Sequence, residues 1–353
     1  MLGNLTRLPR ISLGNFPTPL HEAPNLSREL GGPTVYFKRD DETGLALGGN
    51  KVRKLEFIMP EAIATNSDLV ITSGSLGSNH TRLTAAAARK LGMAPLVVLI
   101  GQKPDEIQGN IRLAHLLGAE IRLINEPTLE FMRKNAANPT LVTDAIAAIA
   151  DEKRAEGKRP FVVPGAGFCP SGCAGYVQAA VEIVSQLGSI GRRADYVVVS
   201  AGSGNTYAGL VLGMKVLSPR SRVIGIDMSA LRSLEALTER VVDIANQTAI
   251  LLGLDTRVSA KDVELHDHSG EGYPVPSRES SYAVIQTARL EGILLDQVYT
   301  GKGMAGLMAL AQAKRFGKGD SVVFVHTGGV PALFSDVEFT KNVGDPQIGF
   351  VTC

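Results

Sequence analysis

The start of one predicted helix gathers more positive charge than a helix start favours. Two glycines and Asn50 precede Lys51, and from Val52 onward apolar residues recur at helical spacing, so a helix is predicted to begin near Lys51. Lys51, Arg53 and Lys54 crowd its first turn, where the helix dipole already contributes positive charge. A bound anion or a neutral lysine would relieve this conflict, and both suit a phosphate-bearing cofactor held as an imine by a lysine. A basic surface turn is the alternative.

A second polar group follows a predicted strand. Ser78 and Asn79 stand between the apolar run at Leu69–Thr72 and a helix, so they are expected at the helix N-terminus. Their side chains and the free backbone N–H groups can bind a substrate carboxylate or a cofactor ring oxygen. Ordinary helix capping is the alternative, and His80 taken alone is better explained as a structural residue.

A third candidate is the glycine-rich turn Ala201-Gly202-Ser203-Gly204-Asn205-Thr206, which separates a strand from a helix. Backbone N–H groups bind a phosphate in this arrangement. The turn matches neither the dinucleotide fingerprint, because Tyr207 occupies the place of its third glycine, nor a P-loop. We therefore predict a single phosphate contacted by Thr206. An ordinary turn is the alternative, and Asp227, about twenty residues further on, leaves a nucleotide open.

Two tyrosines and a final turn complete the candidates. Tyr273 and Tyr299 each lie in a glycine-flanked loop, where a phenol can act as acid, base or hydrogen-bond donor. Half-buried packing is the usual alternative for such a residue. Thr327, in His326-Thr327-Gly328-Gly329, follows an apolar run and can face a cofactor, or it belongs to a tight turn.

The composition excludes several classes of protein. The 353 residues carry a net charge of +1 and are 44% hydrophobic, which does not fit a nucleic-acid or membrane-surface binder. No apolar run approaches the roughly 18 residues of a membrane span, and the first residues lack a signal peptide's apolar core. We expect a cytoplasmic protein without nucleic-acid or membrane partners. Cys169 and Cys173 have neither the spacing nor the second pair of a zinc site, so no metal is expected.

Apolar runs that alternate with helices predict the frame that positions these residues. Such runs indicate parallel strands buried on both faces, first across about residues 55–160 and then in a second series that opens at 161–164. Strands of the second series are predicted at 196–200, 223–227 and 322–326, with helices at 175–187, 207–217, 279–291 and 304–316. The fold class is α/β, with two layered bodies and a cleft between them at the carboxyl ends of strands.

Taken together, the five stretches resemble one family in matching order, from Phe16-Pro17-Thr18-Pro19-Leu20 to Pro331-Ala332-Leu333-Phe334. This is the group of pyridoxal-phosphate (PLP) enzymes that contains D-cysteine desulfhydrase and 1-aminocyclopropane-1-carboxylate (ACC) deaminase. The resemblance implies two doubly wound domains of the tryptophan-synthase-β kind (fold type II), with the cofactor in the cleft. The large PLP-binding domain would comprise residues 1–54 and 161–353 and the small domain residues 55–160, and the enzyme would be a homodimer.

The resemblance also implies a role for each position. Lys51 forms the imine and shuttles the α-proton of a small amino-acid substrate, while Lys54 and the 203–206 turn hold the phosphate. The implied catalytic residues are Lys51, Ser78, Tyr273 and Tyr299; the implied cofactor-binding residues are Lys51, Lys54, Asn79, Ser203, Gly204, Asn205, Thr206, Thr300 and Thr327; and the implied substrate-binding residues are Ser78, Asn79, His80 and Tyr273.

Two threonines indicate the reaction. In this family ACC deaminases typically carry Glu at the position of Thr300 and Leu at that of Thr327, whereas D-cysteine desulfhydrases carry Thr at both. Because Thr300 is neutral, the pyridine nitrogen beside it need not be protonated. The weaker electron withdrawal that results suffices to eliminate a good leaving group but suits cyclopropane opening less well. The expected reaction converts D-cysteine to pyruvate, hydrogen sulfide and ammonia.

The chain departs from the family pattern at its expected carboxylate pocket. Gly77 and Leu83 stand where the family usually has Gln, and Pro274 and Ser277 alter the usual Gly-Tyr-Gly-x-Pro-Asn. The loss of two amides allows a larger or differently charged substrate. L-cysteate sulfo-lyase, ACC deaminase, another lyase or a racemase, and a non-catalytic small-molecule binder are the alternatives.

Overall fold

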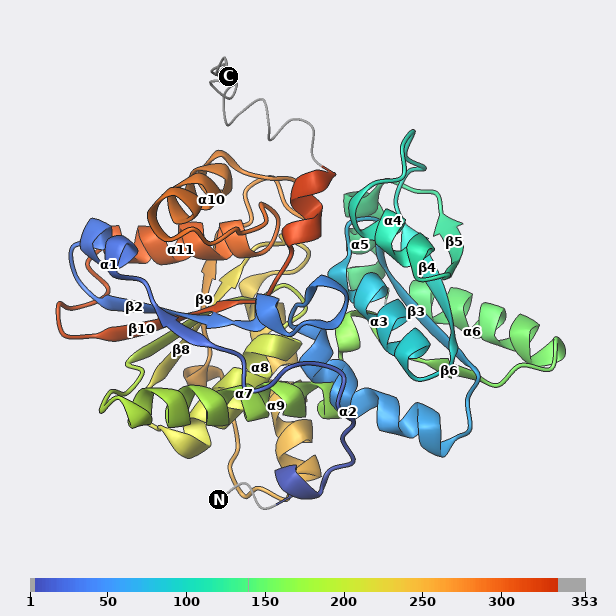
Figure 1. The fold of residues 1–353 in the computed structure, drawn as a ribbon, viewed down its shortest axis with the longest axis horizontal. Coiled ribbons are helices and arrows are strands. Elements are labelled where there is room, and N and C mark those ends of the chain that lie inside the picture. The colour runs from blue at the N-terminus through green and yellow to red at the C-terminus, as the bar shows by residue number, and fades with distance from the viewer. Residues whose placement is uncertain (1–3, 139, 336–353) are drawn as a thin grey trace, which may run out of the picture.

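The chain forms two α/β bodies, each built on its own sheet (Figure 1). The structure is a computed structural model that describes residues 4–138 and 140–335. The strand order is β1-β2-β10-β7-β8-β9 in the six-stranded sheet and β5-β4-β3-β6 in the four-stranded sheet. Among the described strands every pair is parallel except β1 with β2. The predicted α/β class with two layered bodies is confirmed.

The larger sheet is covered on both faces (Figure 1). Val197 and Val199 contact the core beneath α7, α8 and α9, whereas Val198 contacts the core beneath α10 and α11, as the alternation of a strand requires. Its strands are β1 (Leu20–Glu22), β2 (Thr34–Arg39), β7 (Tyr196–Ser200), β8 (Arg222–Asp227), β9 (Glu264–Asp267) and β10 (Ser321–His326). Its helices are α1 (Pro24–Leu30), α7 (Pro170–Ser189), α8 (Asn205–Leu217), α9 (Leu234–Leu251), α10 (Arg278–Glu291) and α11 (Thr300–Gln312).

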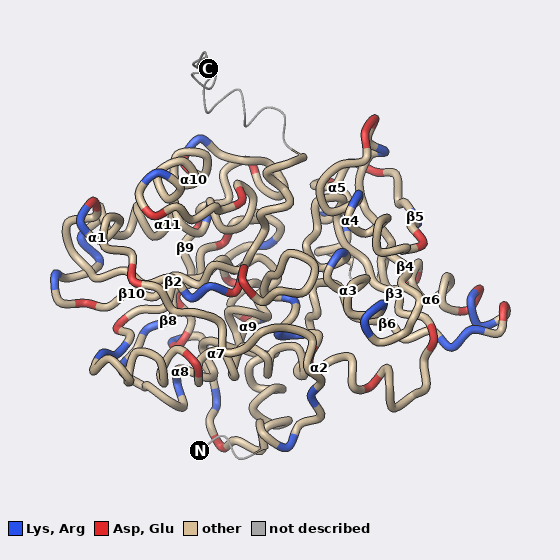
Figure 2. The backbone as a smooth tube through the Cα atoms, viewed as in Figure 1, with Lys and Arg blue, Asp and Glu red and all other residues tan. Residues whose placement is uncertain are grey.

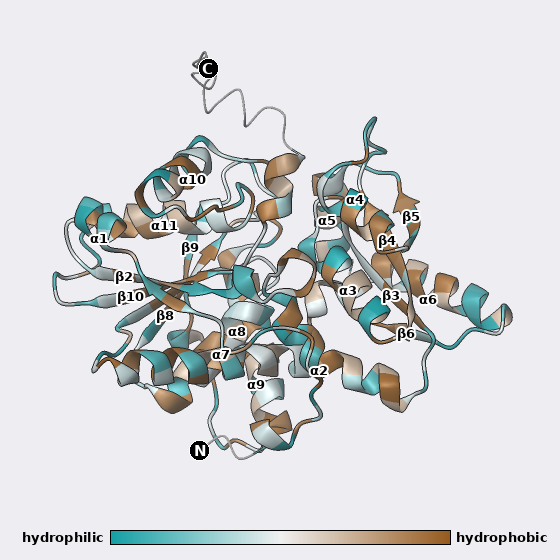
Figure 3. Cartoon of the chain, viewed as in Figure 1, coloured by the Kyte–Doolittle hydropathy of each residue, from teal (hydrophilic) through white to brown (hydrophobic). Residues whose placement is uncertain are grey.

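The smaller sheet follows the same rule. Val70 packs toward α2 and α3 and its neighbour Ile71 toward α6, so β3 is buried on both faces. Figure 3 colours much of this sheet as hydrophobic. Its strands are β3 (Leu69–Ser75), β4 (Ala94–Ile100), β5 (Glu120–Ile124) and β6 (Pro160–Val162). The helices around it are α2 (Lys51–Ala64), α3 (Asn79–Lys90), α4 (Gly109–Leu116), α5 (Thr128–Ala137) and α6 (Thr140–Ala155). Short 3-10 turns lie at Leu5–Arg7, Asp40–Glu42, Leu45–Leu47, Gly165–Gly167, Ala260–Asp262 and Val330–Phe334.

One predicted strand belongs to the other sheet. The sequence indicated that residues 161–164 open the second series, but Phe161 pairs with Val70 and Val162 with Ile71 at the edge of the smaller sheet. That placement was wrong, because parallel pairing joins segments far apart in sequence and leaves no local signal. The division of the chain into residues 55–160 and the remainder stays a proposal.

The N-terminal end of α2 is anchored by buried ion pairs. Arg53 donates to Asp40 from Nε (2.9 Å) and Nη2 (2.8 Å), and to Glu182 from Nη1 (2.7 Å) and Nη2 (2.8 Å). Lys38 Nζ donates to Glu182 at 2.7 Å. Arg53 is therefore neutralised by carboxylates of the protein, and the positive charge left to explain at this helix start belongs to Lys51 and Lys54.

Charges of both signs are scattered along the chain in Figure 2. Within the described residues no helix is both long and apolar enough to cross a membrane. Within the same residues no group of three or more His, Cys, Asp or Glu side chains is placed to hold a metal ion.

Candidate active site

Helix α2 begins at Lys51, as the sequence predicts. Lys51 Nζ donates to Asn50 Oδ1 (3.1 Å), and burial lowers the pKa of Lys51 to about 8. Asn50 also donates from Nδ2 to Thr206 Oγ1 (3.1 Å) and from its backbone N–H to the Thr327 carbonyl (2.9 Å). Asn50 therefore joins three of the predicted stretches, although its side chain does not cap the helix.

Lys54 lies deeper than Lys51. It is fully buried and donates from Nζ to the Ala166 carbonyl (3.1 Å). Burial and the charge of Lys51 lower the pKa of Lys54 well below its usual value. Neither lysine forms an ion pair with a described residue, so the site gathers two amines and offers them no carboxylate.

The glycine-rich turn leads into α8, which begins at Asn205 after Gly204 in the left-handed conformation (φ 87°). The backbone N–H groups of a helix's first turn have no partner within the helix. Asn205 is fully buried; its Nδ2 donates to the Cys169 carbonyl (3.1 Å), and its Oδ1 has no partner among the described residues. Cys169 caps α7 just after Ala166, the residue that Lys54 contacts. The turn and Lys54 thus converge on one segment, and the donors gathered there suit an anion.

Ser78 and Asn79 lie at the start of α3, as predicted. Ser78 Oγ accepts the backbone N–H of His80 (3.2 Å), which is the capping role. Asn79 Oδ1 accepts from Arg82 Nη2 and Asn110 Nδ2, both at 3.2 Å. Because its oxygen is occupied, the amide presents its N–H₂ group, which suits an acceptor such as a ring oxygen.

Arg82 received no role from the sequence, yet it ties α3 to the loop before Lys51. It is fully buried and donates to the carbonyls of Ala46 and Gly48, the latter at 3.0 Å, as well as to Asn79. Burial lowers its pKa to about 10. The signal was present as an arginine one helical turn after Asn79.

His80 turns toward strand β3. Its Nε2 lies 2.8 Å from Thr72 Oγ1, and Thr72 donates its own hydroxyl to the Val163 carbonyl, so Nε2 must be the donor to Thr72. Burial, Lys51 and Lys54 lower the pKa of His80 well below its usual value. These contacts hold β3 and its neighbour together, and a role of His80 in substrate binding stays a prediction.

The two predicted tyrosines, Tyr273 and Tyr299, are hydrogen-bonded to each other through their hydroxyl groups. Tyr273 and Tyr299 bring their hydroxyl oxygens to 2.7 Å, although they come from different loops. Ser75 Oγ contacts the Tyr273 hydroxyl from the other side, and Ser200 Oγ donates to the Tyr299 carbonyl (2.8 Å). Burial raises the pKa of Tyr273, and burial together with Tyr273 raises the pKa of Tyr299 well above its usual value.

Asp296 is a buried carboxylate that sequence reasoning missed. Its Oδ2 accepts the backbone N–H groups of Val298 (2.9 Å) and Tyr299 (2.7 Å), and its Oδ1 accepts that of Thr300 (2.9 Å). Thr300 Oγ1 also donates to Asp296 Oδ1 (2.6 Å) and accepts the Asp296 N–H (2.9 Å). The hydroxyl of Thr300 therefore has only acceptor capacity left for another group.

Lys302 fixes the loop that carries Tyr273. It is fully buried, and Nζ donates to the carbonyls of Met228 (3.3 Å), Ser269 (2.6 Å) and Gly272 (3.1 Å). Burial lowers its pKa to about 8. Lys302 thus joins the end of β8 to both ends of the 269–272 segment.

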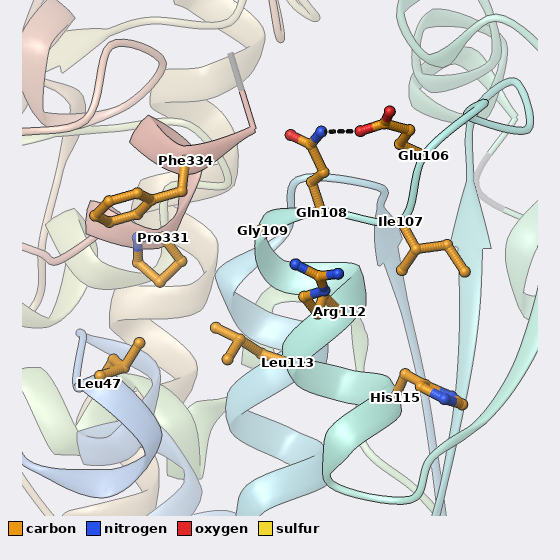
Figure 4. Close-up of a pocket in the computed structure, with 10 residues that line it drawn as sticks. All are labelled: Leu47, Glu106, Ile107, Gln108, Gly109, Arg112, Leu113, His115, Pro331 and Phe334. Atoms are coloured by element: carbon orange, nitrogen blue, oxygen red, sulfur yellow. Dashed lines mark hydrogen bonds between the residues drawn. The ribbon is translucent and has the colours of Figure 1, made fainter. Parts of the chain in front are cut away.

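A pocket of about 750 Å³ opens between α4 and the final 3-10 turn, and its lining includes Leu113, Pro331 and Phe334 (Figure 4). None of the residues predicted for the site lines it. A second pocket of about 450 Å³ is lined by Arg133 of α5 and by Asp227, Arg232 and Asp267 beside the Tyr273 loop.

Comparisons with known proteins identify the family of this chain. A family model described as pyridoxal-phosphate dependent enzyme matches residues 11–328. D-cysteine desulfhydrase of Klebsiella pneumoniae (strain 342) is 41% identical over 340 residues, covering 95% of this chain and 98% of that protein. A protein of Pyrococcus abyssi named as a candidate ACC deaminase is 40% identical over 330 residues, covering 94% of each chain.

Two solved structures have the same fold as this chain. A crystal structure of an ACC deaminase homologue is 37% identical with a TM-score of 0.83, covering 95% of this chain and 96% of that one. Threonine deaminase isoform 2 of Solanum lycopersicum, 19% identical with a TM-score of 0.67 over 97% and 91% of the two chains, shares the fold. The chain therefore belongs to the pyridoxal-phosphate-dependent enzymes, as a fold type II lyase of the D-cysteine desulfhydrase and ACC deaminase family.

Proposed function

We propose that this lyase eliminates the β-substituent of a small amino acid, with D-cysteine as the preferred substrate and pyruvate, hydrogen sulfide and ammonia as products. Relatives named as D-cysteine desulfhydrase and as ACC deaminase match this chain at nearly equal identity. Overall sequence identity therefore does not distinguish between these two reactions. The observation that carries the choice is the uncharged pair Thr300 and Thr327, where the resemblance places Glu and Leu in ACC deaminases.

The residues at the site fit PLP. Lys51 and Lys54 lack a carboxylate partner among the described residues, and the start of α8 offers free N–H groups to a phosphate. Lys51 would carry the cofactor, Lys54 and residues 203–206 its phosphate, and the Asn79 amide its ring oxygen. When bound, PLP supplies an electron sink that makes the substrate's Cα–H bond acidic.

Lys51 moves the first proton. With a pKa of about 8, its amine gives up its proton far more readily than an ordinary lysine and can take the proton from the substrate's Cα. As that bond breaks, the Cβ–S bond breaks too, and its electron pair leaves with the sulfur. Water then completes the release of pyruvate and ammonia.

We propose Tyr299 or Tyr273 as the general acid that protonates the leaving group. Their raised pKa values keep both phenols protonated at neutral pH, so one of them can donate a proton to the departing thiolate. Ser78, whose oxygen already accepts the His80 N–H, keeps its own hydroxyl hydrogen for the substrate.

Thr300 refines the choice of substrate. Because its hydrogen is donated to Asp296, Thr300 offers a ring nitrogen an acceptor and adds no charge to it. A carboxylate at this position would hold a proton on the ring nitrogen more strongly. The milder electron withdrawal left by Thr300 favours a substrate with a good leaving group over a cyclopropane.

L-cysteate sulfo-lyase is the second candidate, and the pocket beside the Tyr273 loop favours it. Arg133 and Arg232 both line this pocket. Burial lowers the pKa of Arg232, and the charge of Asp227 offsets part of that effect. The carboxylates of Asp227 and Asp267 also line this pocket, and each accepts a serine hydroxyl at Oδ1, from Ser229 and Ser269 respectively. A sulfonate would suit the two guanidinium groups.

A substrate panel tests the proposal. Purified holoenzyme is offered D-cysteine, L-cysteine, L-cysteate, β-chloroalanine and ACC, and release of keto acid, sulfide and sulfite is measured. We expect keto acid with sulfide from D-cysteine at the highest kcat/KM. Turnover of ACC without activity on any β-substituted alanine would overturn the choice drawn from the threonines, and cofactor binding without turnover of any substrate would favour the non-catalytic binder.

The cellular compartment and the oligomeric state of the enzyme are also proposals. We expect a cytoplasmic homodimer, on the basis of the family resemblance. Analytical ultracentrifugation of the full chain measures the mass directly, and a monomer at micromolar concentration would contradict the dimer.

A further inference from the structure

Three hydroxyl groups form a chain from one sheet to the other. Ser75 is the last residue of β3 in the smaller sheet, whereas Tyr273 and Tyr299 belong to loops of the larger body. Ser75 Oγ contacts the Tyr273 hydroxyl, which lies 2.7 Å from the Tyr299 hydroxyl. The two rings are tilted by 52° with centroids 5.7 Å apart, so they meet through their hydroxyl ends and do not stack.

The chain has one hydrogen to spare. Three hydroxyl groups carry three hydrogens, and two contacts consume two of them. Ser75 is 4% exposed and Tyr273 is 7% exposed, so water has little access to replace a lost partner. When Ser75 donates to Tyr273 and Tyr273 donates to Tyr299, the free hydrogen lies at the Tyr299 end.

The backbone of Tyr273 is held by the larger body. Its N–H donates to the Ser229 carbonyl (2.9 Å), and Lys302 Nζ donates to the carbonyl of the preceding residue, Gly272. These bonds fix where the ring begins but not where its hydroxyl points. The direction of the phenol is set by its two hydroxyl partners, of which Ser75 is the one that comes from the smaller sheet.

We propose that Ser75 is a positioning residue of this enzyme, which holds the Tyr273 hydroxyl against Tyr299 and orders the chain so that Tyr299 keeps the hydrogen for the leaving group. The catalytic part of this inference rests on the proposed elimination; the positioning contact does not. When Tyr299 donates its proton to the thiolate, Tyr273 and then Ser75 stabilise the phenolate left behind by hydrogen bonds.

Two variants and a matched control test the proposal. Ser75→Ala removes the hydroxyl, and Ser75→Thr restores one on a residue that suits a strand. Ser218→Ala is the control: it also deletes a buried serine hydroxyl, one that contacts Ser221 at the end of α8, away from the tyrosines.

The first readout needs no substrate. Hydrogen exchange of the holoenzyme should rise several-fold in peptides spanning residues 269–277 for Ser75→Ala, and should match the wild type for Ser75→Thr and Ser218→Ala. The second readout is steady-state kinetics, where Ser75→Ala should lower kcat about tenfold, the size of one lost hydrogen bond, and change KM less than twofold. Ser75→Thr should recover most of kcat.

The outcomes separate the two claims. Exchange and kcat that stay at wild-type values in Ser75→Ala would overturn the positioning role. An equal loss in Ser75→Ala and Ser218→Ala would overturn it as well, since a general effect of deleting a hydroxyl would then suffice. If the wild type eliminates nothing from any substrate while Ser75→Ala still loosens residues 269–277, the proposed function fails and the positioning contact stands.

Discussion

Replacing Arg53 with methionine tests how the protein holds the helix that carries Lys51. Arg53 is 2% exposed and makes five hydrogen bonds, two to Asp40, two to Glu182 and one to Thr18. Arg53→Met keeps much of the volume but leaves two buried carboxylates that share one remaining cation, Lys38. Removing one partner of a buried ion pair costs about 3–5 kcal/mol, so we expect the free energy of unfolding to fall by that amount.

Arg122→Met is the matched control. Arg122 pairs with Glu120 and Glu152, but its side chain is 41% exposed, and exposed pairs contribute about 0–1 kcal/mol. Urea unfolding of both variants at equal, saturating cofactor gives the comparison. Equal losses in the two variants would refute the claim that the buried network anchors α2.

The network also predicts a pH dependence. Burial alone would raise the pKa of Asp40 and of Glu182, but Arg53 lowers both below their usual values. A carboxyl group with a lowered folded-state pKa stabilises the protein above its unfolded pKa of about 4, and the effect disappears as pH falls through the folded value. The difference between wild type and Arg53→Met should therefore be full at pH 7 and shrink in acid. A difference that grows below pH 4 would contradict this sign.

Three further predictions concern the site. Lys302→Met strands three buried carbonyl groups, so it should lower stability by about 1–3 kcal/mol and reduce kcat with D-cysteine, as urea unfolding and keto-acid release will measure. The neutral amine of Lys51 is the nucleophile, so the rate at which apoenzyme binds PLP covalently should rise with pH and level off above about 8, whereas a rate independent of pH from 6 to 9 would contradict that. Arg232→Gln should leave D-cysteine turnover within twofold and weaken any L-cysteate turnover at least tenfold; an equal effect on both substrates would remove the second candidate's support.

Local patterns predicted the parts of the fold that local interactions determine. Strand β7 and the start of α2 at Lys51 lie where the sequence placed them, because a short apolar run and a helical repeat are visible within a few residues. Helix boundaries were less accurate: α11 begins at Thr300 rather than at residue 304, and the Asp296 carboxylate, four residues earlier, accepts the backbone N–H of Thr300. The 18-residue helix α9 was not predicted at all.

Contacts between distant residues were beyond the sequence. Arg53 was counted among the charges that need an anion, but its partner Glu182 lies 129 residues away and already neutralises it. The contact between Ser75 and Tyr273 spans 198 residues and joins two sheets. The sequence could list the polar groups at strand ends, but which of them share hydrogen bonds depends on how the two bodies pack.

The most direct measurement is to find which lysine holds the cofactor. Apoenzyme is incubated with PLP, reduced with borohydride and digested, and the modified peptide is identified by mass spectrometry. We predict that Lys51 carries the modification, that Lys51→Ala abolishes it, and that Lys54→Ala weakens cofactor binding but still leaves the label on Lys51. Labelling of Lys54 in the wild type, or no labelled peptide at saturating cofactor, would contradict the account.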